Sequence, residues 1–584
     1  MSIYAQKPWL TSYDKETPKT LLPYPNITLH EQLEDTAKRF PNNIACIFSA
    51  QLPLVGRKGA SYTWHEINDA ASRLSAGLAD LGIKKGDVVA IMMPNCVQFV
   101  IAAYAVFKAG GILSATNPTY PADKLAHQIA DSKAKVMICL TMFYETFKGI
   151  QGQTQVSKVV VTNIKEYMSG AARFLFTLAK EKKTGHKLDN LRDGDVWFHD
   201  LLSRYKAEDQ PKIKFNAEKD VALFQYTGGT TGVSKGAMAT HQGLVANTMN
   251  VQHWLHSDDP SRDRNVGAIP FFHVYGLIAV VFFSASTGSS MIIVPNARDV
   301  TDVVGAMHTY RPTIFACVPA LYTAISNHPL IRAGKADLSS LKVCISGSAP
   351  LAPDTKRTFE ELTGATISEG FGMSECPTAT HFNPLGRPGK NQSIGTPMID
   401  VECKIVSLDD GVTEMPLGEP GELILRSPNT MTGYLNMPTE TANTLRDLGD
   451  GGKPWLYTGD IARMDEEGYF FIVDRKKDMA LIGGFNVYPN NVEKVIADHP
   501  AVREVGVASV PHPEKEGQET LLACVVLHDG KTVSKEELIS FQGKKLANYE
   551  IARRIVFVKE LPKTAVGKVL RRELAKMVAD MEKK

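Results

Sequence analysis

The feature that most constrains this chain is a loop rich in glycine and threonine at residues 226–236, Tyr-Thr-Gly-Gly-Thr-Thr-Gly-Val-Ser-Lys-Gly. The apolar run 221–224, which is typical of a buried strand, precedes it. Glycines let successive backbone N–H groups turn toward an anion, and threonine hydroxyls add further donors. Lys235 adds a positive charge, so the segment predicts a phosphate-binding loop rather than an ordinary glycine-rich turn. It is not a Walker A loop, because Ser234 precedes and Gly236 follows that lysine.

Length and composition limit the classes of protein that this chain can belong to. Its 584 residues are too many for one compact core, so we expect at least two domains. The net charge is only +2 and no long basic block occurs, which argues against a nucleic-acid partner. The eight cysteines include no Cys-x-x-Cys pair, so we expect neither a zinc site nor a disulfide framework, and a reducing, cytoplasmic location.

No segment has the pattern of a signal peptide or of a membrane-spanning helix. The first residues lack an apolar core followed by a cleavage site. The longest apolar run, 274–285, is broken by Gly276 and Ser284 and is shorter than the about 20 residues that a span needs. It predicts a buried core helix.

Residues 60–400 alternate between predicted strands and predicted helices with short connections, which indicates parallel sheets in an α/β domain. Apolar residues recur at helical spacing in 61–86, and 99–110 is an apolar helix ended by two glycines. The predicted strands are the runs 88–93, 135–140, 291–294, 313–316 and 343–346.

The pattern changes near residue 400. The runs 401–406, 421–426 and 469–473 resemble antiparallel strands, so we expect a β-rich subdomain over about 400–473. We place the domain boundary in the five charged residues 474–478, which fit either a solvated turn or a linker between two apolar units. Beyond them we expect a small α+β unit with helices at 491–498, 535–545 and 569–584 and strands at 504–508, 521–527 and 554–558.

A segment at 166–180 is a candidate amphipathic helix. Polar residues at 166, 169, 173, 177 and 180 form one stripe, apolar residues fill the rest, and Lys-Glu-Lys-Lys follows from residue 180. Such a helix suits a membrane interface, whereas packing on the core is an equal alternative.

Two glycine-containing segments have the residue types of a nucleotide site. In 369–375, Glu-Gly-Phe-Gly-Met-Ser-Glu, the ring of Phe371 can stack on a nucleobase, and Ser374 and Glu375 offer the oxygen ligands that Mg²⁺ prefers. In 346–350, Ser-Gly-Ser-Ala-Pro, small residues let a ligand lie flat against the backbone, although a plain turn fits equally well.

Three further positions offer charge or proton chemistry. Asp460, in Tyr-Thr-Gly-Asp before a predicted strand, can accept hydrogen bonds from a ribose diol that Arg475 can also reach, although a turn-capping aspartate is the more common case. Lys568, in Pro-Lys-Thr-Ala-Val-Gly-Lys, follows a glycine and can stabilise a negatively charged transition state, although a lone lysine near a C-terminus is ordinarily a solvated surface charge. His273 lies among aromatic residues in 270–276, where a hydrogen-bonded core histidine is the ordinary interpretation.

These segments, in this order and spacing over residues 60–575, resemble the core motifs of the adenylate-forming superfamily. The run 478–489 and Asn117-Pro-x-Tyr120 are most similar to bacterial long-chain fatty acid–CoA ligases. Most members have tyrosine where this chain has Phe371, so stacking is kept and a hydroxyl contact is lost. The resemblance implies a large N-terminal domain over 1–476 and a small mobile C-terminal domain over 477–584 that rotates about Lys477.

The resemblance also implies a role for each site residue. Lys568, Thr230, Glu375 and His273 would be catalytic, with Glu375 and Thr230 also holding Mg²⁺. His273 would adjoin the acyl carboxylate, and Gly483 and Gly484 would line the pantetheine tunnel. The full set implied to bind the nucleotide or CoA is Thr227, Gly228, Gly229, Thr231, Gly232, Lys235, Gly347, Ser348, Ala349, Pro350, Glu369, Gly370, Phe371, Gly372, Ser374, Asp460, Arg475, Lys477, Gly483 and Gly484.

The implied activity has two steps with ATP and CoA as co-substrates. A fatty acid reacts with MgATP to give an acyl-adenylate and pyrophosphate, and the CoA thiol then displaces AMP. Four alternatives remain open: a medium-chain or aryl-carboxylate CoA ligase, an enzyme that loads a carrier protein, a luciferase-like oxygenase and, least favoured, a non-catalytic ATP-binding protein. The oligomeric state is also open, a homodimer included, and so is a peripheral contact with the inner face of the membrane.

Overall fold

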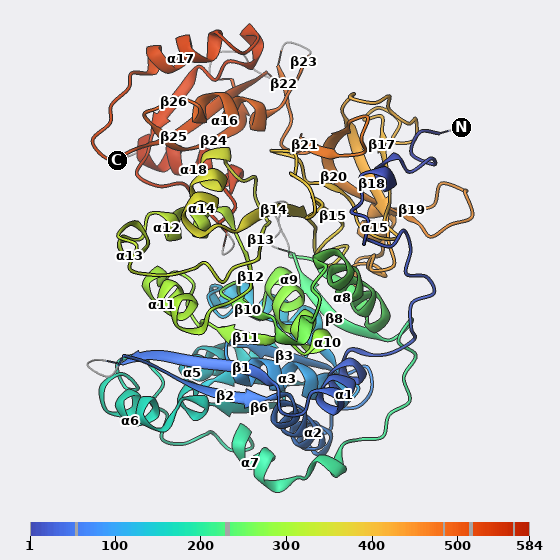
Figure 1. Ribbon diagram of the computed structural model, residues 1–584, viewed down its shortest axis with the longest axis vertical. Helices are drawn as coiled ribbons and strands as arrows, with labels where there is room; N and C mark the ends of the chain where they lie inside the picture. Colours follow the sequence, from blue (N-terminus) through green and yellow to red (C-terminus); the bar gives the residue numbers. More distant parts are fainter. Residues whose placement is uncertain are drawn as a thin grey trace.

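The computed structural model describes residues 2–52, 56–227, 234–482, 485–512, 518–564 and 567–582 (Figure 1). It confirms the predicted α/β fold, with large sheets flanked by helices and a small unit of strands and helices at the C-terminal end. The predicted strands and helices all form, with ends that differ by a few residues.

The first large sheet has seven strands in the order β7-β6-β5-β3-β4-β8-β9, and all neighbours run parallel except the β8–β9 hairpin. Its strands are β3 (Val88–Met92), β4 (Ile112–Ala115), β5 (Val136–Leu140), β6 (Lys158–Thr162), β7 (Val196–Trp197), β8 (Val221–Tyr226) and β9 (Gly236–Thr240).

The second large sheet has nine strands in the order β16-β15-β14-β13-β12-β10-β11-β1-β2. It is parallel from β14 to β1, with antiparallel strands at both edges. Its strands are β1 (Ile44–Leu52), β2 (Gly56–Thr63), β10 (Arg264–Gly267), β11 (Ser290–Ile293), β12 (Ile314–Cys317), β13 (Val343–Ser346), β14 (Thr366–Phe371), β15 (His381–Phe382) and β16 (Thr396–Pro397).

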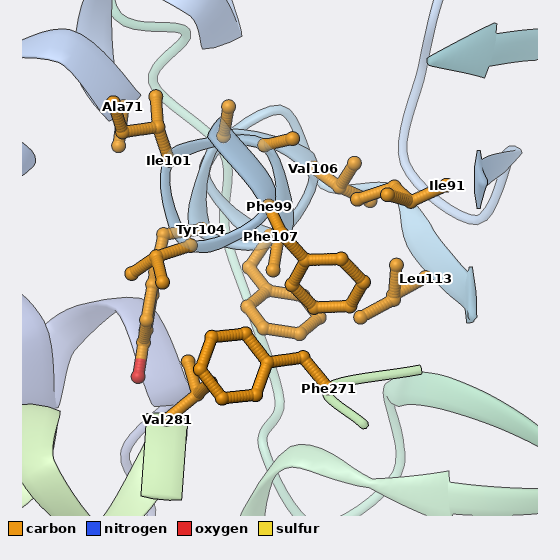
Figure 2. Packing of buried hydrophobic residues seen from close by; sticks show 14 of the residues in the cluster. Ala71, Ile91, Phe99, Ile101, Tyr104, Val106, Phe107, Leu113, Phe271 and Val281 are labelled. Carbon is orange, nitrogen blue, oxygen red and sulfur yellow. The ribbon is translucent and has the colours of Figure 1, made fainter. Parts of the chain in front are cut away.

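The two sheets sandwich a layer of helices, and the alternation of residues along β3 shows why. Val89 and Ile91 face the cluster between the sheets, whereas Val88, Ala90 and Met92 face a second cluster under α4 and α5. Helix α3, which is buried at every position, lies in the middle layer. Figure 2 shows its side chains packed among Ile91 of β3, Leu113 of β4, and Phe271 and Val281 of the segment that follows β10.

The helices of the large sheets and their surroundings are α1 (Leu29–Arg39), α2 (Trp64–Asp80), α3 (Val97–Lys108), α4 (Ala122–Ser132), α5 (Thr141–Ile150), α6 (Gly170–Ala179), α7 (Phe198–Arg204), α8 (His241–Leu255), α9 (Val274–Gly276), α10 (Phe283–Thr287), α11 (Val300–Tyr310), α12 (Pro319–Ser326), α13 (Pro329–Arg332), α14 (Pro353–Thr363) and α15 (Pro438–Thr444). The predicted core helix at 274–285 is present as α9, the π-helical turn η6 (Leu277–Phe282) and α10 in succession. Among the described residues no helix is both long enough and apolar enough to cross a bilayer.

The β-rich part is a five-stranded sheet, antiparallel throughout as predicted, in the order β17-β18-β20-β19 with β21 beside β20. Its strands are β17 (Glu402–Val406), β18 (Gly421–Arg426), β19 (Leu445–Arg446), β20 (Trp455–Met464) and β21 (Phe470–Arg475).

The small C-terminal unit lies at one end of the molecule (Figure 1) and has its own hydrophobic clusters, formed by residues from 480 onward. Its elements are β22 (Ala480–Ile482), β23 (Phe485–Val487), α16 (Pro489–Ala497), β24 (Val502–Pro511), β25 (Glu519–Leu527), α17 (Lys535–Gly543), β26 (Arg554–Phe557) and α18 (Arg571–Glu582).

Three local predictions need correction. Asp460 lies inside β20 rather than before a strand, because the strand continues through Gly459, whose φ of 70° coincides with a register shift in the pairing with β18. The amphipathic helix begins at Gly170 rather than at 166, because Met168 and Ser169 are extended after a short 3₁₀ turn. The run 474–478 is not simply solvated, since the Asp474 side chain is fully buried.

Candidate functional site

The β8–β9 hairpin holds both ends of the predicted phosphate loop. The backbone N–H of Thr227 donates to the carbonyl of Lys235 at 2.9 Å, and the Ser234 hydroxyl donates to the carbonyl of Thr227 at 2.5 Å. The two ends are therefore fixed side by side, as a loop that closes on an anion requires. The intervening Gly228, Gly229, Thr230, Thr231 and Gly232 lie outside the described residues.

Lys235 belongs to a small polar group with Tyr434 at its centre. The Lys235 ammonium pairs with Glu440 of α15 and lies 5.1 Å from the centroid of the Tyr434 ring. On the other side of this ring, the Tyr434 hydroxyl donates to Glu375 at 2.7 Å. Tyr434 thus places the predicted phosphate lysine and the predicted metal ligand around one aromatic side chain.

The segment 369–375 is shaped by close backbone contacts. A Cβ on Gly372 would lie 1.2 Å from the carbonyl oxygen of Thr378, so only glycine fits there. A Cβ on Gly370 would meet the Phe382 ring at 2.7 Å. The Phe371 ring, held by a T-shaped contact with His381 at 6.0 Å, is partly exposed, as are Ser374 and Glu375.

The connection after β13 lies against β14 and against the segment that contains His273. The backbone N–H of Leu351 donates to the Glu369 carboxylate at 3.3 Å, which holds the run of Gly347, Ser348, Ala349 and Pro350 beside β14. Burial raises the pKa of Glu369. A Cβ on Gly347 would lie 3.2 Å from the ring of Tyr275, so the small residue permits this packing.

His273 forms the N-cap of α9, and its Nδ1 accepts from the backbone N–H of Tyr275 at 3.2 Å. Part of the ring is solvent-accessible, yet the surrounding protein removes enough water to lower its pKa to about 4. The Thr378 hydroxyl donates to the carbonyl of Val274 at 3.1 Å. His273 is therefore neutral near pH 7 and lies beside the 372–378 segment.

Asp460 and Arg475, the two residues predicted to bind a ribose, form an ion pair. The Arg475 guanidinium lies 2.9 Å from the Asp460 carboxylate across the β20–β21 pair. Asp460 is only 5% exposed, and its charge is the main cause that raises the pKa of Arg475. Arg475 also lines a cavity of about 310 Å³ with Thr458, Gly459, Lys476 and Lys477.

Lys568 comes from the small C-terminal unit and lies within this charged group. Burial and the nearby Arg475 lower the pKa of Lys568 to about 8, whereas Asp460 and Asp478 act in the opposite direction. Gly567, with φ of 79°, lies near Ala320 of α12, since a Cβ built on it would be 3.8 Å from that side chain. The Lys568 loop is thus docked on the large unit.

Lys477 stands at the predicted boundary between the two units, and burial lowers its pKa. The nearby carboxylates of Asp460 and Asp478 partly oppose this effect. Gly483 and Gly484 are outside the described residues. The predicted site residues therefore lie close enough for their charges to act on one another. The charges of Asp460 and Glu375 raise the pKa of Arg475, and, besides burial, those of Arg475, Asp460 and Lys477 affect the pKa of Lys568.

Sequence reasoning missed several members of this group. Arg571 of α18 contacts Asp474, Asp478 and Glu493, and Tyr434 and Glu440 partner the predicted residues Glu375 and Lys235. Arg571 lies only three residues beyond Lys568, and this proximity in sequence could have indicated that it belongs to the same charged group. Tyr434 and Glu440 have no local pattern that indicates a site.

The oxygen atoms that the protein offers near Glu375 fit a magnesium ion whose other ligands are phosphate and water. One oxygen of Glu375 accepts from Tyr434, which leaves the second oxygen of this partly exposed carboxylate for a metal. Among the described residues no group of three or more His, Cys, Asp or Glu side chains gathers as a protein-only metal site.

Comparison with known proteins gives concordant matches over nearly the whole chain. Residues 33–435 match the model of the AMP-binding enzyme family, and residues 491–568 match the AMP-binding enzyme C-terminal domain. The chain is 39% identical over 570 residues to a long-chain-fatty-acid–CoA ligase of Bacillus subtilis, covering 98% of each chain. It is 33% identical to the ligase of the same name from Escherichia coli O6:H1, covering 97% of this chain and 98% of that one. The crystal structure of ATP-bound MatB from Rhodopseudomonas palustris superposes with a TM-score of 0.80 at 26% identity, covering 95% of this chain and all of the other.

Proposed function

The chain belongs to the AMP-binding enzyme family, and we propose that it is an ATP-dependent long-chain fatty acid–CoA ligase. Support for the substrate class comes from the curated relatives, which match over almost their full length and are named for this activity. Support for a nucleotide substrate comes from the ATP-bound MatB structure and from the geometry around Asp460 and Arg475.

The proposed reaction has two balanced steps. In the first, a carboxylate oxygen of the fatty acid attacks the α-phosphorus of ATP, and the bond to pyrophosphate breaks. In the second, the sulfur of CoA attacks the acyl carbon, the thiol proton is released, and AMP leaves with the electrons of the acyl–oxygen bond. The mixed anhydride makes the carbonyl reactive toward a thiol, which an ionised carboxylate is not.

The observation that supports the first step best is the docked position of Lys568. Its ammonium would lie next to the nucleotide if Asp460 and Arg475 hold the ribose, and there it would stabilise the charge that develops on the α-phosphate. The buried surroundings strengthen this attraction, because few water molecules screen it.

Other site residues would bind and orient the substrates. Phe371 would stack its ring on the adenine. Thr227 and Lys235 would hold the two ends of the loop that binds the triphosphate. His273, neutral because of its lowered pKa, would adjoin the acyl carboxylate without adding a charge. Among the described residues, Glu375 would hold Mg²⁺, which neutralises phosphate charge when bound, and Thr230 remains a predicted second ligand.

We also propose that the small unit rotates about Lys477 between the two steps. The loop that contains Lys568 and the segment around Gly483 and Gly484 are both parts of this unit, which cannot present both to one site at the same time. The domain division at 476–477 and the role of these glycines in the pantetheine tunnel remain predictions.

The test is AMP release that depends on both ATP and CoA, measured with straight-chain acids from short to very long. We expect the highest kcat/KM with long-chain acids. A preference for an aromatic acid or for a carrier protein would contradict the proposed substrate, and the absence of AMP with every acid would contradict the activity.

We further propose that the enzyme takes its substrate from the surface of a membrane without spanning it, because long-chain acids partition into bilayers. A homodimer remains a prediction that light scattering on the purified protein can check.

A further inference from the structure

Helix α6 exposes large apolar side chains to solvent. Leu178 is 70% exposed and Phe174 is 64% exposed, the two highest values among the large apolar side chains of the described residues. Since they are four residues apart on a helix, they lie side by side on one face, and Leu175 is 36% exposed next to them. Large apolar side chains that lie together on an exposed face mark a surface that contacts another protein or a membrane.

The rest of α6 shows that this face is not a poorly packed core face. Ala172 is buried, and Phe176 turns inward, where its ring makes a T-shaped contact with His186 at 5.6 Å. Packing on the core therefore explains Ala172 and Phe176 but not Phe174 or Leu178. The helix lies at the periphery of the molecule (Figure 1).

The exposed charged residues of α6 and of the turn after it, up to residue 186, are all positive: Arg173, Lys180, Lys182 and Lys183. The next lysine, Lys187, pairs with the exposed Asp189 at 3.4 Å. The only acidic residue in the range 170–186, Glu181, is 8% exposed and is neutralised by Lys165 at 2.7 Å. The net charge of the whole chain is only +2, so this is a local concentration of positive charge.

We propose that α6 and the turn after it form a docking surface for an anionic lipid bilayer. This surface, named the α6 surface, consists of Phe174, Leu175 and Leu178 with Arg173, Lys180, Lys182 and Lys183. The apolar side chains enter the boundary between headgroups and acyl chains, and the cations contact anionic headgroups. The inference rests on the proposed function in one respect, that the substrate is an acid dissolved in the bilayer.

The charge of the α6 surface favours a bilayer over a second copy of the chain. Pairing through a twofold axis would bring the same lysines of both copies together, and like charges at an interface oppose association. An anionic bilayer satisfies the apolar face and the cations at once.

The test is flotation of the full-length protein with vesicles of phosphatidylcholine alone or of phosphatidylcholine and phosphatidylglycerol in equal amounts. We expect binding to the mixed vesicles, much weaker binding to phosphatidylcholine, and release by salt. Phe174→Ser with Leu178→Ser should weaken binding to the mixed vesicles by about tenfold or more. Lys182→Glu with Lys183→Glu should weaken it by about tenfold or more as well, without affecting the residual binding to phosphatidylcholine.

Matched controls separate this surface from general effects. Leu22 and Val412 are 63% and 57% exposed, so Leu22→Ser with Val412→Ser removes comparable apolar surface elsewhere and should leave binding unchanged. Lys531→Glu with Lys535→Glu makes the same charge change on exposed positions of the small unit and should have only the weak effect of the altered net charge.

The proposal is wrong if the parent protein does not bind mixed vesicles, or if the Phe174/Leu178 variant, folded by circular dichroism, binds them like the parent. It is also wrong if that variant instead dissociates an oligomer in light scattering, because the face would then bind a second copy. Activation of a soluble shorter acid should persist in all variants. If the parent protein also fails to activate the soluble acid, this result counts against the proposed ligase activity and not against the lipid surface.

Discussion

The carboxylate of Asp474 lies 2.9 Å from the guanidinium of Arg571, although 97 residues separate them in the chain. Asp474 also accepts from the backbone N–H of Asn490 at 2.8 Å, and Arg571 contacts Glu493 at 2.8 Å. Asp474 precedes the proposed hinge at Lys477, whereas its partners follow it. These contacts therefore fasten the small unit in the orientation that docks the Lys568 loop.

Asp474→Asn should weaken the contacts with Arg571 and Asn490 without removing every hydrogen bond. We expect acyl-adenylate formation to fall about tenfold, because a charge-assisted hydrogen bond contributes about 1.5 kcal/mol or more. Thioester formation from supplied acyl-adenylate should be unchanged, since it needs the other orientation. The measurement is the rate of each half-reaction. Asp465→Asn, which removes an ion pair with Lys390 inside the large unit, is the control. Equal loss of both half-reactions in Asp474→Asn would mean that the contact only stabilises the fold.

Glu375→Gln should raise the Mg²⁺ concentration needed for adenylation. It replaces an anionic oxygen by a neutral amide while keeping an acceptor for the Tyr434 hydroxyl. A magnesium titration of acid-dependent ATP–pyrophosphate exchange measures the effect, with Glu440→Gln as a variant that alters the neighbouring Lys235 pair instead. An unchanged titration for Glu375→Gln would remove this residue from the metal site.

The pH dependence of adenylation should report on Lys568. Because its pKa is lowered to about 8 in the free enzyme, the ammonium loses its proton as pH rises through that value, and kcat/KM for exchange should fall. Pyrophosphate exchange needs no CoA, so the thiol does not contribute. In Lys568→Arg any remaining activity should lose this alkaline fall, since a guanidinium stays charged. A parent profile that is flat from neutral to alkaline pH would contradict the assignment.

Buried histidines should make the large unit sensitive to acid. Burial lowers the pKa values of His30, His241 and His381 to about 3. The folded protein therefore keeps these rings neutral, whereas the unfolded chain takes up protons as pH falls below about 6.5. The free energy of unfolding should decrease over this range, by about 1.4 kcal/mol per pH unit for each histidine.

Urea unfolding at about pH 7.5 and about pH 5 measures this dependence. His241→Gln should reduce the difference between the two, whereas His127→Gln, at an exposed position, should not. If the parent is equally stable at both values, these histidines are not kept neutral by the fold.

Much of the fold was predictable because its signals are local. Uninterrupted apolar runs locate β3 and β5, since both strands are buried at every position and are apolar throughout, and a mainly apolar run likewise locates the buried helix α3. Local sequence patterns do not show which residue a charged side chain pairs with in the fold. The charged run 474–478 looks solvated, yet Asp474 is buried because Arg571 reaches it from the end of the chain.

The site was predictable to the same extent and for the same reason. Segments that contain glycines indicate places where two backbone segments approach closely. Gly372 is an example, because a Cβ at this position would clash with the carbonyl oxygen of Thr378. By contrast, Tyr434 and Glu440 enter the candidate site because residues 432–435 pair with β9. No pattern within their own segment indicates this pairing.

Comparing the two half-reactions of Lys568→Ala tests whether the docked lysine serves adenylation. Acid-dependent ATP–pyrophosphate exchange should be nearly abolished, because the charge near Asp460 and Arg475 is gone. Thioester formation from supplied acyl-adenylate and CoA should remain near the parent rate. Loss of both half-reactions to the same degree, in a variant that unfolds at the parent temperature, would contradict the proposed role.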